Sequence, residues 1–349
     1  MMRVEILGPT SPQWTGVLEA TAHDFYHLPA YAELSARLDG GSAKALVVRE
    51  GDRTLLLPFT ARPIPDGDGA WDALTPYGYP GPLAQGCDDD SVDERNAFAT
   101  RAMEAAAEVL RADGCVSLFA RLHPLLGARP EPANARLVQH GTTVHVDLRK
   151  SDAEHWAETM SGHRNEINRA IKAGHRAYFD EVFGHADRFV QIYQATMARV
   201  GAAAHYFFDH EYLMSLREAL GERLKLAVVE IDGTIAATGL FVETGKIVQY
   251  HLSGTDEAFL RDRPTKLMLH FVRGWAKERG ASWLHLGGGV GGGEDSLFKF
   301  KAGFSKERSP FYTLRLVVDP AAYRALSRAR HPDVDETHLE GFFPLYRRP

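Results

Sequence analysis

Residues 284–305 read LHLGGGVGGGEDSLFKFKAGFS, and this stretch decides how the chain is interpreted. The apolar run ending at Leu286 predicts a strand, and six glycines interrupted by one valine follow it. Asp295 or Ser296 is then placed to cap a short helix that Gly303 closes. Glycines at this density let a ligand approach backbone N–H groups, and a helix N-terminus favours negative charge. The glycines alone are also compatible with a mobile loop that has no ligand.

The short helix after the glycines carries two lysines. On a helix Lys299 and Lys301 lie roughly 200° apart, so at most one of them faces inward together with Phe298 or Leu297. A helix with both lysines in solvent is the alternative. The spacing of the glycines is neither the dinucleotide-binding fingerprint nor a nucleotide-hydrolase phosphate loop.

Two parts of the chain repeat one order of predicted elements. Residues 44–60 and 224–242 each read as two strands around a turn, at Gly51-Asp52 and Asp232-Gly233. A helical pattern and another strand follow each hairpin, at 95–110 and 115–120 in the first half and at 267–277 and 282–286 in the second. This repetition predicts an α/β fold with mixed sheets, built from two copies of one unit.

The boundary between the copies is expected after a segment rich in Pro, Gly and Ala, residues 127–141. We therefore predict an N-terminal domain at 1–150, a second domain at 151–320, and a C-terminal helix and tail at 321–349.

Composition narrows the class of protein. A chain of 349 residues with 44% hydrophobic and 25% charged residues is expected to fold into two globular domains. The start lacks the pattern of a signal peptide and no apolar run is long enough to span a bilayer, so we expect a cytoplasmic enzyme. Only Cys87 and Cys115 occur, and the sixteen histidines form no HExxH-type pair, so neither a disulfide framework nor a metal site is expected. The net charge of −6 excludes a generally basic protein.

The region around the opening stretch resembles a known family. Residues 250–305 look like the second catalytic half of the Fem family of peptidyltransferases and its GNAT-like relatives, and FKAGF at 300–304 matches the family's FK-x-x-F element. SGHRNEINRAIKAG at 161–174 and FFDHEYLMSL at 207–216 are also similar, so the likeness covers most of residues 150–318. TPYGYPGPL at 75–83 resembles the Tyr-Gly-rich loop of such proteins.

This resemblance implies two tandem GNAT-like domains that move an aminoacyl group from aminoacyl-tRNA to the amine of a peptide-like acceptor, without a metal or other cofactor. It further implies that the Lys301 ammonium stabilises the oxyanion that forms on the ester. A donor at that position contributes much of the rate of acyl transfer. The acceptor amine must also lose a proton, for which Asp295 and Glu294 are candidates, although Asp295 is the better candidate for the helix cap.

The chain offers further candidate residues for the acceptor pocket. Hydroxyl-bearing aromatic and small polar side chains combine apolar contact with orientation, and glycines admit a ligand. The candidates are Tyr77, Tyr79, Tyr250, Ser253, Thr255, Gly288 and Gly289. For the two tyrosines of the loop, core packing beside a Gly-Pro turn is the alternative.

The stretch RDRPTKLMLH separates two kinds of acyl donor. Acetyl-CoA-dependent relatives place a glycine-containing loop before this helix, whereas Arg261 to Lys266 contains no glycine and has Pro264 at the expected first helical position. A standard CoA site is therefore disfavoured. The cations proposed for phosphates of tRNA, which fit surface charges equally well, are Arg164, Arg169, Arg261, Arg263 and Lys266.

Three hypotheses remain from the sequence. The first is an aminoacyl-tRNA-dependent aminoacyltransferase acting on a cell-wall precursor or a secondary metabolite. The second is an N-acyltransferase that uses acyl-CoA or an acyl carrier protein. The third is a non-catalytic binding protein of the same fold.

Overall fold

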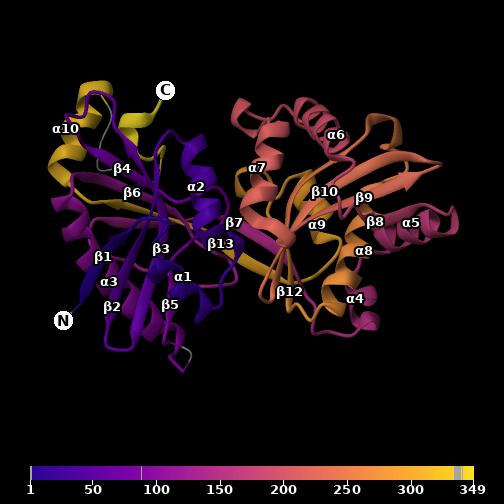
Figure 1. The fold of residues 1–349 in the computed structure, drawn as a ribbon, viewed down its shortest axis with the longest axis horizontal. Helices are drawn as coiled ribbons and strands as arrows, with labels where there is room; N and C mark the ends of the chain where they lie inside the picture. Colours follow the sequence, from indigo (N-terminus) through magenta and orange to yellow (C-terminus); the bar gives the residue numbers. More distant parts are fainter. Residues whose placement is uncertain (1, 88, 334–338, 340) are drawn as a thin grey trace. The chain divides into compact units, whose positions relative to one another are not determined.

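A computed structural model describes residues 2–87, 89–333, 339 and 341–349, and the chain divides into two compact units. The first unit contains the residues up to Gly141 together with Pro310–Pro349, and the second contains Thr142–Ser309. Each unit has a mixed sheet with helices on both faces (Figure 1). The predicted α/β class is therefore confirmed. The second unit is thus inserted into the first, which is completed by residues 310–349. The expected boundaries at 150 and 320 do not include this insertion.

The sheet of the first unit has the strand order β1-β2-β3-β4-β6-β13, with β5 beside β3. All neighbours are antiparallel except β4 and β6, which are parallel. The predicted hairpin is present, with its turn at Gly51-Asp52. The strands are β1 (Arg3–Leu7), β2 (Ser42–Glu50), β3 (Arg53–Pro63), β4 (Trp71–Leu74), β5 (Leu83–Gln85), β6 (Cys115–Arg121) and β13 (Arg308–Val317).

Helices cover the two faces of this sheet. Successive residues of a strand point to opposite faces, so Leu46 and Val48 pack with α3 whereas Ala45 and Val47 pack with α1 and α2. Ser91 caps α3 in a capping box with Glu94. The helices are α1 (Pro12–Glu19), η1 (Phe25–His27), α2 (Pro29–Leu38), α3 (Val92–Ala112), α10 (Pro320–Arg330) and η6 (Leu345–Arg347).

The sheet of the second unit has the order β7-β12-β11-β10-β9-β8. Here β11 and β12 form the parallel pair, and the other neighbours are antiparallel. The second predicted hairpin is also present, with its turn at Asp232-Gly233. The strands are β7 (Ala135–Asp147), β8 (Arg176–Phe179), β9 (Leu224–Ile231), β10 (Thr234–Thr244), β11 (Ile247–Thr255) and β12 (Trp283–Gly287).

In the second unit α5, α8 and α9 pack on one face of the sheet, against Phe241 and Val248 among others, while α6 lies against β10 and β11 and α7 against β9. Pro264 occupies the first turn of α8, as predicted. The helices are α4 (Asp152–Glu158), α5 (Ser161–Lys172), α6 (Ala186–Arg199), η2 (Ala204–Tyr206), α7 (His210–Leu220), η3 (Gly221–Arg223), η4 (Glu257–Phe259), α8 (Pro264–Glu278), η5 (Val290–Gly292) and α9 (Ser296–Ala302).

The two units share one topology. Both sheets have the same strand order and the same single parallel pair when the strands are matched in chain order, β1, β2, β3, β4 and β6 to β8, β9, β10, β11 and β12. The sixth strand differs in its place along the chain, since β7 directly precedes the other elements of the second unit whereas β13 joins the first unit from beyond the second. The repetition that the sequence predicted is therefore a duplication of strand topology.

Candidate active site

The candidate site of the second unit lies where β11 and β12 part. These strands are paired in parallel only over Ile247–Gln249 and Trp283–His285. Beyond this, β11 continues to Thr255, whereas β12 ends at Gly287 and enters the glycine loop. Backbone groups that are no longer paired between strands are available to a ligand.

The glycines of the loop are required by its geometry. Gly287, Gly291 and Gly292 have φ of 78°, 62° and 86°, a region that side chains disfavour. A Cβ on Gly289 would lie 2.1 Å from the Gly293 carbonyl oxygen. The loop is therefore a compact turn with a defined conformation.

Asp295 holds the loop to the helix that follows. Its Oδ1 accepts a hydrogen bond from the Phe298 N–H at 2.8 Å, and its Oδ2 accepts one from the Val290 N–H at 3.0 Å. Burial acts to raise the pKa of Asp295, but hydrogen bonds from the backbone N–H groups of Phe298, Val290 and Leu297 outweigh it and lower the pKa. This carboxylate caps α9, as predicted, and both of its oxygens are occupied. Glu294 beside it is exposed.

Lys301 points inward from α9, and Lys299 is exposed. The Lys301 side chain is 9% exposed, and its Nζ donates to the Gly288 carbonyl oxygen at 2.7 Å and lies 5.9 Å from the centre of the Tyr250 ring. Burial lowers the pKa of Lys301 to about 8, and Asp295 opposes this shift. The structure thus confirms that one lysine faces inward, and places a buried ammonium against the glycine loop.

The helix α9 is fixed by a contact that the sequence did not reveal. His163 of α5 hydrogen-bonds through Nε2 to the Phe300 carbonyl oxygen at 3.0 Å, and the Met160 N–H donates to the Gly303 carbonyl oxygen at 2.8 Å. A Cβ on Gly303 would lie 2.4 Å from His163 Nε2. The glycine therefore does more than close the helix, since it makes room for the imidazole that holds α9.

Tyr250 and Ser253 meet because β11 contains a bulge. Three residues apart on a regular strand, they would point to opposite faces. In the pairing with β10, however, Leu240 faces Leu252 and Phe241 faces Tyr250, so His251 is an extra residue in β11. The two hydroxyls consequently lie on one side and are hydrogen-bonded to each other.

Thr255 lies at the end of the same strand. Its hydroxyl is 2.7 Å from that of Thr265 on α8, and its N–H donates to Thr196 Oγ1 at 3.2 Å. These contacts give Thr255 a role in joining β11 to two helices. Its predicted role in substrate binding stays a prediction.

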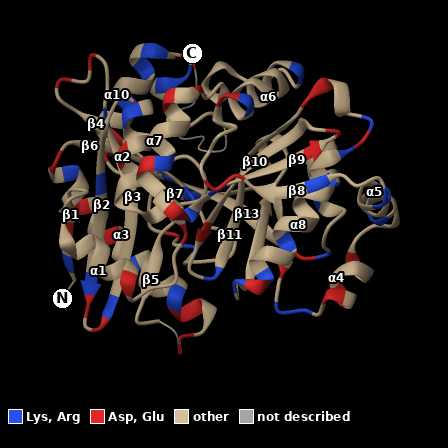
Figure 2. Ribbon diagram, turned by 45° about the vertical axis from the view of Figure 1, so that its right-hand side comes forward, with Lys and Arg blue, Asp and Glu red and all other residues tan. Residues whose placement is uncertain are grey.

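The predicted phosphate-binding cations differ in their surroundings. Arg164 donates to the carbonyl oxygens of Trp156 and Thr159 at 3.0 and 2.9 Å, which satisfies the end of α4, and Lys266 is paired with Glu166. The exposed cations are Arg169 on α5, where basic residues are visible in Figure 2, and Arg261 and Arg263 before α8.

Arg263 caps α8 in a left-handed conformation with φ of 53°, which is uncommon outside glycine. The start of α8 is thus built without the glycine-containing loop expected of a standard CoA site.

Tyr77 and Tyr79 belong to the first unit. The Tyr77 carbonyl accepts from the Tyr31 hydroxyl at 2.9 Å, and the ring of Tyr79 lies 5.2 Å from that of Phe311. Gly78 between them has φ of 109°, and a Cβ there would lie 2.0 Å from the Tyr26 ring. The loop is therefore closely packed in its own unit, and its role in an acceptor pocket stays a prediction.

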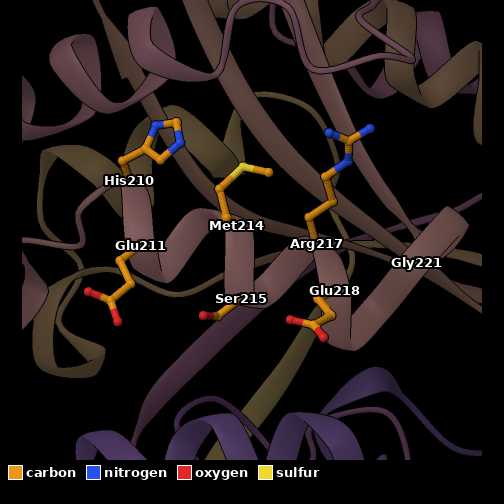
Figure 3. A pocket seen from close by; sticks show the side chains of 7 residues that line it. All are labelled: His210, Glu211, Met214, Ser215, Arg217, Glu218 and Gly221. Carbon is orange, nitrogen blue, oxygen red and sulfur yellow. The ribbon is translucent and has the colours of Figure 1, made fainter.

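A shallow hollow of about 620 Å³ runs along α7, and Figure 3 shows that its labelled side chains all project from this one helix and its end. Among the residues that the structure describes, no three His, Cys, Asp or Glu side chains are grouped so that they can hold a metal ion. No helix in the described ranges is both long enough and apolar enough to cross a membrane.

Comparison with known proteins identifies the class of this fold. Residues 159–300 match the acetyltransferase (GNAT) domain family, a range that includes the glycine loop and ends one residue before Lys301. The crystal structure of FemX aligns with a TM-score of 0.69 at 13% identity, covering 92% of this chain and 99% of that one. A tandem GNAT protein from the clavulanic acid biosynthesis pathway aligns with a TM-score of 0.50 at 14% identity, covering 92% and 99%. The chain thus has a tandem GNAT-like fold.

A sequence relative carries the comparison further. The chain is 24% identical over 275 residues to the UDP-N-acetylmuramoylpentapeptide-lysine N(6)-alanyltransferase of Weissella viridescens, covering 74% of this chain and 81% of the relative. Together with the FemX structure, this match confirms the predicted resemblance to Fem-type transferases. The chain is accordingly an enzyme of the acyltransferase class.

Proposed function

We propose that this protein transfers an aminoacyl group from aminoacyl-tRNA to the amine of a peptide-like acceptor, a cell-wall precursor or a secondary metabolite, in the cytoplasm. The observation that carries the proposal is the buried Lys301 ammonium against the glycine loop, where β11 and β12 part. The alanyltransferase relative, whose name specifies a muramoylpentapeptide lysine as acceptor, supports the choice of group and acceptor.

The reaction places a defined demand on Lys301. The acceptor nitrogen attacks the ester carbonyl carbon, a C–N bond forms, and the C–O bond to the tRNA ribose breaks. Negative charge builds on the carbonyl oxygen between these events. An ammonium has three N–H donors, and Lys301 gives one to Gly288, so two remain for the oxyanion. The hydrogen bond to Gly288 fixes the ammonium before the substrate arrives.

The proton of the attacking amine must reach the departing ribose oxygen. Asp295 is poorly suited to accept it, because both of its oxygens accept backbone N–H groups and its pKa is lowered. The joined hydroxyls of Tyr250 and Ser253 suit a relay better, since each can donate and accept. Burial raises the pKa of Tyr250 to about 12, so its hydroxyl stays protonated between turnovers.

The donor tRNA needs cations at the surface. Arg169, Arg261 and Arg263 are exposed and meet this need, whereas Arg164 and Lys266 are occupied within the protein. We therefore assign phosphate contacts of the tRNA acceptor end to the three exposed arginines.

An acyl-CoA-dependent N-acyltransferase is the second candidate, and the match to the acetyltransferase domain favours it. The start of α8 disfavours it, because Arg263 and Pro264 stand where a glycine-containing loop would present N–H groups to a pyrophosphate.

The donor is tested by incubating the purified protein with radiolabelled charged tRNA and a panel of peptide amines, with and without ribonuclease, and then with labelled acetyl-CoA. We expect ribonuclease-sensitive transfer from tRNA, and label that moves only from the thioester would overturn the proposal.

Lys301→Ala should lower the rate by about 100-fold or more, whereas the control Lys299→Ala on the same helix should not. Unchanged turnover in Lys301→Ala would remove this lysine from the mechanism, and a wild type without transfer from either donor would favour a binding protein.

A further inference from the structure

A second hollow in the second unit has no part in the site around Lys301. It has a volume of about 660 Å³ and is lined by residues of α4, α8 and β8. Three aromatic side chains form its apolar walls, namely Trp156, Phe271 and Trp275. The volume suits a small ligand, and aromatic walls suit a flat one.

A buried cation lines this hollow. Arg273 is 6% exposed and donates through Nη1 to Thr159 Oγ1 and through Nη2 to His270 Nδ1, each at 3.0 Å. Within the described residues no carboxylate forms an ion pair with Arg273, and the nearby Asp152 accepts from Lys277 Nζ at 2.8 Å instead. A guanidinium stays charged and has five N–H donors, so a buried one without a counterion favours an anionic ligand.

His270 adds a second donor to the same wall. Because its Nδ1 accepts from Arg273, its Nε2 must carry the proton of the neutral ring. Burial lowers the pKa of His270 to about 4, with Arg273 adding to the shift, so the ring is neutral near pH 7. Arg273 and His270 thus contribute N–H donors to the wall of the hollow, whereas the two carboxylates that also line it, Asp152 and Glu278, are exposed to solvent.

An exposed glycine of α8, Gly274, also lines the hollow. Gly274 lines it from the interior of α8, where glycine is less favourable than alanine. No packing contact requires the glycine, since a Cβ there would meet no atom within 4 Å. The space that a side chain would occupy is part of the hollow.

We propose that this hollow binds a small aromatic carboxylate, with its ring between Trp156 and the aromatic side chains of α8 and its carboxylate on Arg273 and His270. Charge-assisted hydrogen bonds of a guanidinium to a carboxylate are short and strong. The charges of Asp152 and Glu278 repel any anion, but both side chains are exposed and screened by solvent, and the repulsion grows with the charge of the ligand, so a single carboxylate is favoured over polyanions such as nucleotides.

The test compares 2-naphthoate with the uncharged 2-naphthamide by calorimetric titration of the full chain. We expect saturable binding of the carboxylate and binding of the amide that is about tenfold weaker or more. Absent binding of 2-naphthoate, or equal affinity for the two compounds, overturns the proposal.

Variants of two exposed helix glycines then locate the site. Gly274→Leu fills the hollow while favouring the helix, so it should weaken naphthoate binding by about tenfold or more without loss of folding. Gly162→Leu on α5 is the matched control, since a Cβ there also meets nothing within 4 Å, and it should bind as the wild type does. Unchanged binding in Gly274→Leu overturns the assignment to this hollow. Because binding is measured without tRNA, the result is independent of the proposed aminoacyl transfer.

Discussion

Replacing Lys301 by methionine should slow aminoacyl transfer by about 100-fold or more and make the protein more stable at the same time. A fall in the pKa of this lysine from 10.5 to about 8 corresponds to about 3 kcal/mol of unfavourable burial of the charged form. Methionine removes the charge and keeps the length of the side chain, but it leaves the Gly288 carbonyl oxygen without this donor, which costs about 1 kcal/mol. The free energy of unfolding should therefore rise by about 2 kcal/mol at pH 7, with a rise in Tm of about 3 °C.

The pH dependence of this gain identifies its cause. A depressed lysine pKa means that the folded state binds fewer protons than the unfolded state between pH 8 and 10.5. The penalty in the wild type is therefore fully present below pH 8 and disappears as the pH rises through 10.5. Urea unfolding of both proteins at pH 7 and at about pH 10 should show the gain at the lower pH and little of it at the higher. Lys299→Met is the matched control and should change neither stability nor rate. A Lys301→Met protein that is less stable than the wild type, or equally stabilised at both pH values, would refute the reasoning.

Three further predictions concern the same site. Asp295→Ala should destabilise the fold by about 1 kcal/mol and slow transfer by about tenfold or more. Asp295→Asn still accepts a backbone N–H and should retain most activity in a steady-state assay. Equal losses of activity in the two variants would instead indicate that Asp295 is a general base. Gly303→Ala should cost about 1 to 3 kcal/mol in thermal unfolding because its Cβ displaces His163, and most of that cost should vanish in a His163→Ala background. At a fixed concentration of unprotonated acceptor, the rate should fall as the pH rises through about 8 and Lys301 loses its proton, and a rate still rising near pH 9.5 would contradict this.

Local rules were sufficient to predict the elements that hold the site. The turns at Gly51-Asp52 and Asp232-Gly233 were identified by dipeptides that favour hairpins, and Asp295 by its place before a short helix. The 200° separation of two lysines limited the inward residue to one, and the family likeness selected Lys301. Each of these inferences depends on residues only a few positions apart.

Features that depend on tertiary contacts were not predictable in this way. The strand β13 belongs to the first unit because it pairs with β6, which lies far away in the sequence. The bulge at His251 has no signature in the residues around it, and without the bulge Tyr250 and Ser253 would not meet. The basic composition of its helix makes Arg164 a candidate phosphate ligand, whereas its contacts with the carbonyl oxygens of Trp156 and Thr159 leave no signature in the sequence.

The duplicated topology also explains why only the second unit is assigned the chemistry. In the first unit the counterparts of the parting strands are β4 and β6, and the chain after β6 carries His123 in place of a glycine loop. The Leu125 and Leu126 N–H groups donate to His123 Nδ1, so Nε2 donates to the buried Asp24 carboxylate at 2.9 Å. A Cβ on Gly81 would lie 2.7 Å from the His123 backbone nitrogen, so the segments are in close contact there. After β6 the first unit thus has a buried, hydrogen-bonded Asp–His pair, whereas after β12 the second unit has a loop of glycines whose Gly288 carbonyl oxygen accepts from Lys301.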